Sequence, residues 1–351
     1  MDTVLPSSAV AAAPVPPAPP PPCESPRVAP TLSPQARAVL GDFEDKFVEV
    51  GTCASTGKRV TICYNAFGNP AHPCVLLIQG MGSSLLGCSL RFVKRLVDRG
   101  YYVIRYDNRD VGLSTRFDEF GSPALVRLAL PQWMSIGERR PYVLEDIMED
   151  AVGLLTALGV RQAHLFGGSM GGMIAQLIAI HHPERALSLS ILATHAGGVD
   201  ITHPGLWHYT RFLRQPRSDS IEDRAAHMLW LINYLSQGAY NADAEQLKRY
   251  ILCTYERNGA MDNAGLPRQA AAVMRAASRA EGLRRVTCPA LVIHGFKDPL
   301  IPVANAHHLA DLLPNSKLVI FPQLGHNFPP ELVDPIAEEV LLTMKLATVS
   351  S

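Results

Sequence analysis

The sequence predicts an α/β protein built on a mainly parallel β-sheet. From about residue 44, short apolar segments of strand character alternate with segments whose apolar residues recur at helical spacing. Some apolar segments are unbroken, as in CVLLIQG at 74–80, which is typical of a parallel strand buried on both faces. A third observation is the stretch GGSMGG at 167–172, in which a serine between glycine pairs joins such a strand to a helix.

The elements of the core follow one another along the chain. The first two strands, at 46–52 and 59–68, are separated by a glycine-containing turn. Further strands are predicted at 74–80, 101–107, 163–168, 186–194, 289–295 and 317–322. Helices with one apolar face are predicted at 89–100, 144–159, 170–182 and 303–314, with a last helix from about Pro330. We therefore assign the core to residues 35–195 and 286–351.

Residues 196–285 interrupt this alternation. They contain no convincing strand, and the segments 207–215, 225–236, 244–256 and 267–280 are helical in pattern. A helical insertion between two strands predicts a cap over one end of the sheet. Aromatic residues concentrate there, and they either form the core of the cap or line a substrate pocket: Trp207, Tyr209, Trp230, Tyr234, Tyr250 and Tyr255.

The N-terminus and the overall composition exclude several classes of protein. Residues 1–34 are mostly Pro, Ala and Ser, which predicts a disordered tail rather than a signal peptide. The formal net charge is zero, which argues against nucleic acid or an anionic membrane as a partner, and no apolar run is long enough for a membrane helix. Seven scattered cysteines without a CxxC pair favour a reducing, cytoplasmic location over a disulfide framework or a zinc site.

Ser169 is the first candidate catalytic residue. A very tight strand-to-helix turn crowds the positions two residues before and after its apex, so Gly167 and Gly171 are expected for steric reasons. Such a turn strains the apex residue and holds its hydroxyl over the helix N-terminus, where negative charge is favoured. The hydroxyl is then poised to attack a carbonyl, with the N–H of Met170 ready to bind the oxyanion.

A serine nucleophile needs a general base and an acid that orients it. Asp298 lies just past the strand PALVIHG, and His326 lies just past the strand KLVIFP. The order Ser169, Asp298, His326 is the order of the nucleophile-elbow fold, and all three follow strands that end at the same edge of the sheet. Asp200, which follows the strand at 186–194, is the rival for the acid.

Over about residues 44–347 the chain resembles the α/β-hydrolase family. The elbow GGSMGG, the acid in GFKDPLIP and the histidine in GHNFPPE match the family's nucleophile, acid and base. IQGMGSS at 78–84 takes the place of its His-Gly oxyanion loop, with Gln79 for the histidine, which implies the N–H of Met81 as the second oxyanion donor. YDNRDVGLST resembles another family loop but has Asp110 in place of a glycine. The chain is most similar to small cap-bearing carboxylesterases, including methyl esterases that act on polyketides.

Other polar residues have structural interpretations. Asp107 and Arg109 are expected to fix their loop by mutual hydrogen bonds, and His294 is expected to be a satisfied core histidine. The pairs His181–His182 and His307–His308 lack an HExxH pattern or a third ligand, so no metal site is predicted. No cofactor is predicted either. Cys88 is expected to be a buried, inert thiol.

The leading functional hypothesis is a hydrolase that cleaves a small-molecule ester through an acyl-enzyme. A second is an acyltransferase, because GGSMGGM also resembles the elbow of homoserine O-acetyltransferases. A third is a non-catalytic binding module with an α/β-hydrolase shell. A perhydrolase or a C–C hydrolase can use the same triad, whereas dehalogenases and epoxide hydrolases use Asp where this chain has Ser169. The sequence does not indicate an oligomeric state.

Overall fold

The predicted sheet is present and mainly parallel. The computed structural model describes residues 28–123, 140–205, 207, 208, 211, 214, 216–240, 243–259 and 265–349. In this part of the chain the strands are β1 (Lys46–Thr52), β2 (Arg59–Phe67), β3 (Cys74–Ile78), β4 (Tyr102–Tyr106), β5 (Ala163–Gly168), β6 (Ala186–Leu192), β7 (Ala290–Gly295) and β8 (Ser316–Phe321). Their order is β1-β2-β4-β3-β5-β6-β7-β8. The pairs β1–β2 and β2–β4 are antiparallel, and the other neighbours are parallel.

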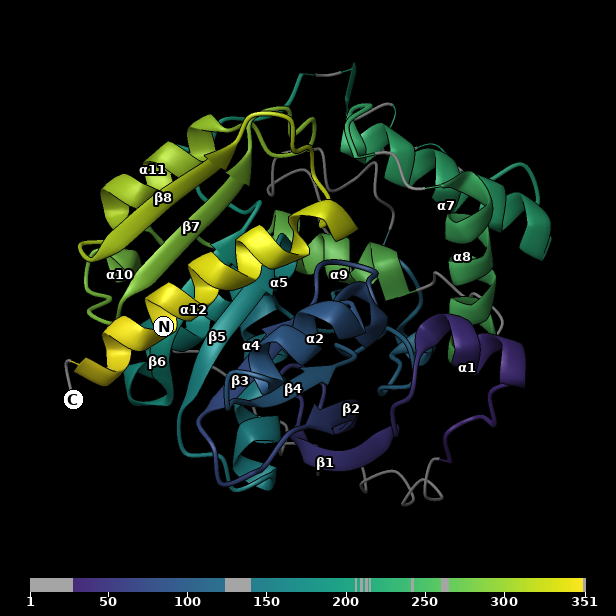
Figure 1. Ribbon diagram of the computed structural model, residues 1–351, viewed down its shortest axis with the longest axis horizontal. Coiled ribbons are helices and arrows are strands. Elements are labelled where there is room, and N and C mark those ends of the chain that lie inside the picture. Colours follow the sequence, from purple (N-terminus) through teal and green to yellow (C-terminus); the bar gives the residue numbers. More distant parts are fainter. Residues whose placement is uncertain are drawn as a thin grey trace, which may run out of the picture.

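Helices cover both faces of the sheet (Figure 1). One face is covered by α2 (Leu90–Val97) and α12 (Val333–Val349), and the other by α4 (Leu144–Ala157), α5 (Met170–His181) and α11 (Ala304–Leu312). The central strand β3 shows why its sequence is unbroken and apolar. Val75 and Leu77 pack with the first helix group, while Cys74, Leu76 and Ile78 pack with the second.

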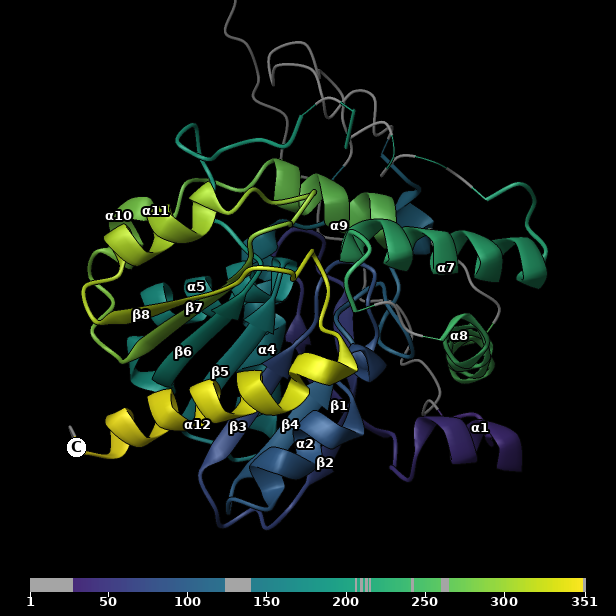
Figure 2. The same cartoon turned by 45° about the horizontal axis from the view of Figure 1, so that its top comes forward.

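The cap consists of helices between β6 and β7. They are α7 (Ile221–Ser236), α8 (Ala244–Asn258) and α9 (Gly265–Met274), followed by the short α10 (Ala280–Leu283). Side-chain caps fix two of the starts, because Ser220 Oγ accepts the Asp223 N–H at 3.2 Å and Asp243 Oδ1 accepts the Gln246 N–H at 2.9 Å. Figure 2 shows α8 between α7 and α1, and α8 contacts both of these helices.

One of the helices predicted in the cap is shorter than expected, and another lies mostly outside the described residues. The helix expected at 267–280 instead ends at Met274, and residues 275–279 are not helical. The chain leaves the helix because Arg279 is buried against the core: its N–H donates to the Ala196 carbonyl at 2.8 Å, and its guanidinium donates to Gln176 Oε1 at 2.9 Å. Most of the helix expected at 207–215, Tyr209 included, lies outside the described residues.

The N-terminal segment begins to pack before residue 35. Residues 1–27 of the predicted tail lie outside the described residues, but Leu32 is buried in a cluster with Leu40 and Leu85. Ser33 caps the helix α1 (Pro34–Leu40), which the sequence analysis did not predict, and its N–H and hydroxyl both donate to the Glu256 carboxylate on α8. The packed part of the chain therefore starts a few residues earlier than the predicted boundary.

Candidate active site

Ser169 occupies the turn between β5 and α5. Its φ of 53° and ψ of −120° lie in a region that costs a non-glycine residue about 1–3 kcal/mol. Two hydrogen bonds hold the residue there: its N–H donates to the Leu192 carbonyl at 2.9 Å, and the Thr194 hydroxyl donates to its carbonyl at 2.8 Å. Both partners belong to the end of β6 or follow it directly, so the neighbouring strand stabilises the strained turn.

Glycines flank Ser169 because the turn leaves no room for side chains. A Cβ atom on Gly167 would collide with the Gly171 carbonyl, and one on Gly171 would collide with the Ile78 carbonyl in β3. The steric requirement predicted for these two glycines is confirmed. α5 starts at Met170, whose N–H has no acceptor within the helix because it belongs to the first turn.

Asp298 and His326 meet beyond the ends of β7 and β8. Asp298 Oδ2 lies 2.7 Å from His326 Nδ1, while Oδ1 accepts the N–H groups of Leu300 and Ile301, both at 2.8 Å. A carboxylate next to Nδ1 assigns the proton to that nitrogen and leaves the Nε2 lone pair available. The Asp298 side chain is fully buried, whereas that of His326 is 10% exposed. Asp200, the rival acid, is not hydrogen-bonded to His326.

The charge of Asp298 is stabilised by its neighbours. Burial by itself would raise the pKa of this carboxyl group. The positive charge that His326 can carry, together with hydrogen bonds from His294 and His326, outweighs burial and holds the pKa well below its usual value. Asp298 is therefore ionised at neutral pH and can stabilise a positive imidazolium on His326.

His294 contacts the same carboxylate, which the sequence analysis did not foresee. This β7 residue is fully buried; its Nε2 lies 2.8 Å from the Ile301 carbonyl and 3.4 Å from Asp298 Oδ2. Its Nδ1 has no hydrogen-bond partner among the described residues, so the expectation of a satisfied core histidine is wrong in that respect. The spacing His-x-x-x-Asp across a strand end is the sequence signal for this contact.

The turn after β3 lies against Ser169. A Cβ atom added to Gly80 would be 3.4 Å from Ser169 Cβ, so the two backbones are in close contact. The Ser83 N–H donates to the Gly80 carbonyl at 3.2 Å, and Gly82 has φ +68°, as at the third position of a type II turn. The Met81 N–H is in the middle of this turn and makes no hydrogen bond to any residue that the structure describes.

The cap contacts both the histidine loop and the turn after β3. The His326 N–H donates to the Leu235 carbonyl of α7 at 2.8 Å, and a Cβ atom on Gly325 would collide with that carbonyl. The Gly82 N–H donates to Gln269 Oε1 of α9 at 2.8 Å. The cap is thus joined to the candidate site at two points through backbone groups of the core.

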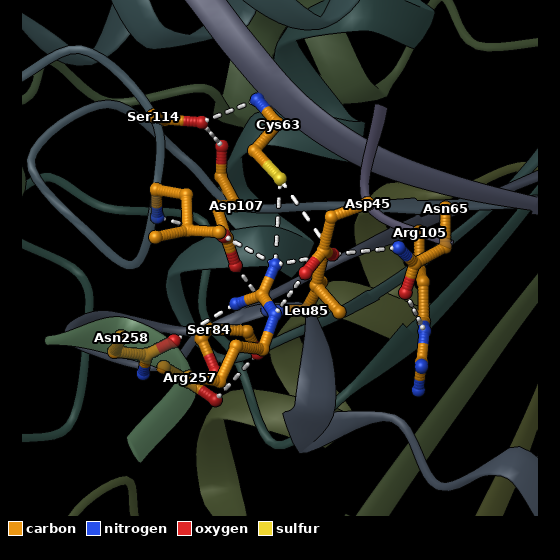
Figure 3. Close-up of polar contacts among 12 residues, drawn as sticks. Asp45, Cys63, Asn65, Ser84, Leu85, Arg105, Asp107, Ser114, Arg257 and Asn258 are labelled. Carbon is orange, nitrogen blue, oxygen red and sulfur yellow. Dashed lines mark hydrogen bonds and ion pairs between the residues drawn. The ribbon is translucent and has the colours of Figure 1, made fainter. Parts of the chain in front are cut away.

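The loop after β4 is fixed by partners other than those predicted. Arg109 forms a two-bond pair with Asp150 of α4, at 2.6 and 2.7 Å, rather than with Asp107. Asp107 instead contacts Arg257 of the cap, whose guanidinium lies between the carboxylates of Asp107 and Asp45, at 3.0 and 2.7 Å (Figure 3). The predicted mutual Asp107–Arg109 bonds are therefore wrong, because each residue pairs with an element distant in sequence.

Asp110 stands where the α/β-hydrolase loop that this segment resembles has a glycine. It has φ 67°, so the left-handed conformation that favours glycine is kept. Its buried carboxylate accepts two bonds from Arg268 of α9, at 2.8 and 2.7 Å, and one from the Tyr142 hydroxyl at 2.6 Å. The side chain that replaces the glycine thus anchors the cap to the core.

The cap aromatics have different surroundings. Trp230 stacks on Tyr234 with ring centroids 5.6 Å apart, and Arg214 lies over the Trp230 ring. The Tyr250 hydroxyl donates to the Leu86 carbonyl, whereas Trp207 is 62% exposed. Tyr255 belongs to the small core between α7 and α8.

Other candidate ligands do not gather into a site. The described residues contain no group of three or more His, Cys, Asp or Glu side chains that could hold a metal ion. Cys88 is buried, and burial raises the pKa of its thiol to about 11. No helix in the described part of the chain is both long and apolar enough to span a membrane.

A strained serine at a strand-to-helix turn, with a histidine–carboxylate pair beyond the last two strands, defines a hydrolase of the α/β class. Residues 73–331 match the alpha/beta hydrolase fold family, and the chain belongs to that family. Among solved structures, a 2-hydroxy-6-oxo-6-phenylhexa-2,4-dienoate hydrolase from Rhodococcus sp. strain RHA1 superposes with a TM-score of 0.64 at 18% identity, covering 86% of this chain and 99% of that chain. At this identity the superposition shows a shared fold alone.

Similar curated proteins include rhodomycin D methylesterases. One from Streptomyces sp. (strain C5) is 30% identical over 318 residues, which cover 84% of this chain and 98% of the relative. Another from Streptomyces peucetius is 29% identical with the same coverage. A 2-hydroxymuconate semialdehyde hydrolase from Pseudomonas putida is 32% identical but covers 59% of this chain and 73% of the relative. The resemblance to methyl esterases expected from the sequence is confirmed by the first two.

Proposed function

We propose that this protein is a serine hydrolase that cleaves a carboxylic ester of a small molecule through an acyl-enzyme on Ser169. The observation that carries the proposal is the 2.7 Å hydrogen bond between Asp298 and His326 at the sheet edge where the strained Ser169 turn also lies. That bond assigns a proton to Nδ1, so Nε2 is the nitrogen that can accept a proton from the serine hydroxyl.

The first half of the proposed reaction acylates the serine. Ser169 Oγ attacks the acyl carbon as its proton passes to His326 Nε2, and the Asp298 carboxylate stabilises the imidazolium. The N–H groups of Met81 and Met170 donate to the oxyanion of the tetrahedral intermediate. When the intermediate collapses, the bond between the acyl carbon and the alkoxy oxygen breaks, and His326 returns the proton to the leaving alcohol.

The second half releases the acid. Water attacks the acyl carbon as His326 Nε2 takes its proton, a second oxyanion forms in the same hole, and the bond to Ser169 Oγ breaks. His326 then returns the proton to the serine. All atoms and electron pairs come from the ester, water and these side chains, so the steps need no metal or cofactor.

We further propose that the substrate is a methyl ester, with methanol as the first product. Support comes from two relatives that are named methylesterases and are matched over 98% of their own length. The shape of the acid would then be selected by the cap, whose helices contact both the histidine loop and the turn after β3.

The test is a panel of p-nitrophenyl and methyl esters with acyl groups of graded size, run beside acetyl-CoA with added alcohols. The proposal predicts that methyl esters release methanol and acid without an added alcohol, and that Ser169→Ala removes most of the turnover. Ser218→Ala, an exposed serine in the cap, is the matched control and should keep wild-type rates. Turnover only when an alcohol accepts the acyl group would identify an acyltransferase instead.

A further inference from the structure

The cap residue Gln269 is hydrogen-bonded to backbone groups of two core loops, which a cap that only selects the substrate does not need. It lies on α9, is fully buried, and uses both ends of its side-chain amide. Its Oε1 accepts the Gly82 N–H at 2.8 Å, and its Nε2 donates to the Arg109 carbonyl at 2.8 Å. The two backbone groups belong to different loops of the core, after β3 and after β4, so one side chain from the cap joins both.

The bond to Gly82 acts on the peptide group next to the proposed oxyanion donor. Met81 and Gly82 are the two central residues of the turn that the Ser83 N–H closes onto the Gly80 carbonyl. The turn depends on the orientation of the peptide between them, because type I and type II turns differ by a flip of that peptide. Gln269 binds the N–H of this peptide and so selects the orientation that accompanies φ +68° at Gly82.

The turn is held on its other side by the core. The Asn108 side-chain amide donates to the Gln79 carbonyl at 3.1 Å, one residue before the turn begins. Gln269 supplies the restraint after Met81, and Leu266 of α9 packs on Gly82, where an added Cβ atom would be 2.9 Å from Leu266 Cδ1. The Met81 N–H therefore lies between one anchor from the core and one from the cap.

Gln269 is itself held firmly. Arg268, the preceding residue on α9, is buried and forms ion pairs with Asp110 and Asp118 of the core at 2.7 and 2.6 Å. Arg109, whose carbonyl accepts from Gln269, is fixed by its two bonds to Asp150. Small errors in the aim of an oxyanion donor reduce catalysis, and buried polar contacts of this kind hold such donors in place.

We infer that Gln269 is a positioning residue for the oxyanion hole, so that the cap completes the catalytic site as well as covering it. This inference rests on the proposed function, since it takes the Met81 N–H as an oxyanion donor. Gln269 does not act on the substrate directly. It fixes the Met81–Gly82 peptide inside a turn that the Ser83 N–H closes onto the Gly80 carbonyl. Gln269 therefore restrains the place of the whole turn, and with it the position of the Met81 N–H.

The principal test is Gln269→Met, which keeps a side chain of similar length and removes both hydrogen bonds. Loss of an oxyanion donor lowers kcat by about a hundred- to a thousand-fold, so a donor that is loosened but present should lose about ten- to a hundred-fold. KM should change by less than about three-fold, because the ground-state ester does not need the aligned donor. Gln246→Met, an exposed glutamine of the cap, is the matched control and should behave as wild type.

A transition-state analogue separates positioning from general loosening of the fold. Ser169 Oγ adds to the carbonyl carbon of a trifluoromethyl ketone, and the ketone oxygen becomes an oxyanion in the proposed oxyanion hole. Its affinity for Gln269→Met should fall by the same factor as kcat/KM, while the affinity for the carboxylic acid product should stay near that of wild type. An unchanged affinity for the ketone, or no loss of kcat, would overturn the inference.

A second variant covers the case in which Gln269→Met unfolds at the assay temperature. Gln269→Glu keeps an oxygen that accepts the Gly82 N–H, but its second oxygen faces the Arg109 carbonyl and can donate to it only when the buried carboxyl group is protonated. Its kcat should therefore lie between those of Gln269→Met and wild type. An equal loss in the glutamate variant and the methionine variant would refute the positioning role. If wild type itself lacks esterase activity, the proposed function fails; an active wild type with an unaffected Gln269→Met overturns this inference alone.

Discussion

Replacing Asp298 with Asn tests the acid of the proposed triad, and the structure fixes how the amide must sit. Oδ1 of Asp298 accepts two backbone N–H groups, from Leu300 and Ile301. The oxygen of the asparagine must remain there, because turning the amide would leave each of the two donors unsatisfied at about 1–3 kcal/mol apiece. The NH₂ group therefore replaces Oδ2 and faces His326 Nδ1, which lies 2.7 Å away in the wild type.

That arrangement reverses the tautomer of His326. Nδ1 must become the acceptor, so the proton moves to Nε2, which can then no longer take a proton from Ser169. The carboxylate charge that stabilises the imidazolium is also lost. The corresponding change in a serine protease costs about ten-thousand-fold in kcat, which serves as an upper guide. We predict that Asp298→Asn folds and loses at least about a hundred-fold in kcat.

The assay is steady-state kinetics on one activated ester, with circular dichroism to check folding. Asp200→Asn is the matched control, since Asp200 is the rival acid and is not hydrogen-bonded to His326; it should lose little activity. A pronounced loss in the Asp200 variant together with near-normal activity in the Asp298 variant would refute the placement of the acid.

Three further predictions concern the tail, the cap and the pH dependence of stability. Deleting residues 1–27 should leave the melting temperature unchanged, whereas deleting 1–34 should lower it by several degrees, because Leu32 is buried and Ser33 caps α1; equal melting temperatures would contradict this. Trp230→Ala should change kcat/KM for the largest ester by a greater factor than kcat/KM for the smallest ester. Equal losses of kcat/KM on both esters would indicate a folding role instead. Burial lowers the pKa of His164 and of His195 to about 4 from an ordinary 6.5, so the unfolded chain binds more protons between these pH values. The unfolding free energy should therefore fall as the pH drops from 6.5 to 4, by about 1.4 kcal/mol per pH unit for each histidine. Urea titrations at pH 7 and 5 measure this loss, and it should be smaller in His164→Gln. An equal loss in His164→Gln and wild type would show that His164 does not contribute to it.

The core elements were predictable because their signals are local. Apolar periodicity placed the strands and core helices, and the glycines around Ser169 indicated a tight turn. The α1 helix was missed although Ser33 and Pro34 form a standard helix start, because they follow directly on a proline-rich segment. The predicted helix at 267–280 failed because burial of Arg279 against Gln176 outweighs the local helical pattern of residues 275–279.

The contacts between cap and core could not be predicted from local pattern. Arg257 binds Asp45 across 212 positions of the chain, and Arg268 binds Asp110 across 158. Nothing in the neighbourhood of either arginine distinguishes a buried anchor from a charge on an exposed helix face. The same holds for Gln269. Its partners are the Gly82 N–H and the Arg109 carbonyl, and backbone groups carry no sequence signal.

The most direct test of the central claim is to identify the residue that acts as the nucleophile. The protein is treated with a fluorophosphonate probe, which phosphonylates an activated serine, and is then digested. The modified peptide is identified by mass spectrometry, with Ser169→Ala and His326→Ala treated in parallel. The proposed mechanism predicts one adduct, on Ser169, that is absent from Ser169→Ala and formed much more slowly in His326→Ala. An adduct at another residue, or labelling of Ser169→Ala equal to that of wild type, would contradict it.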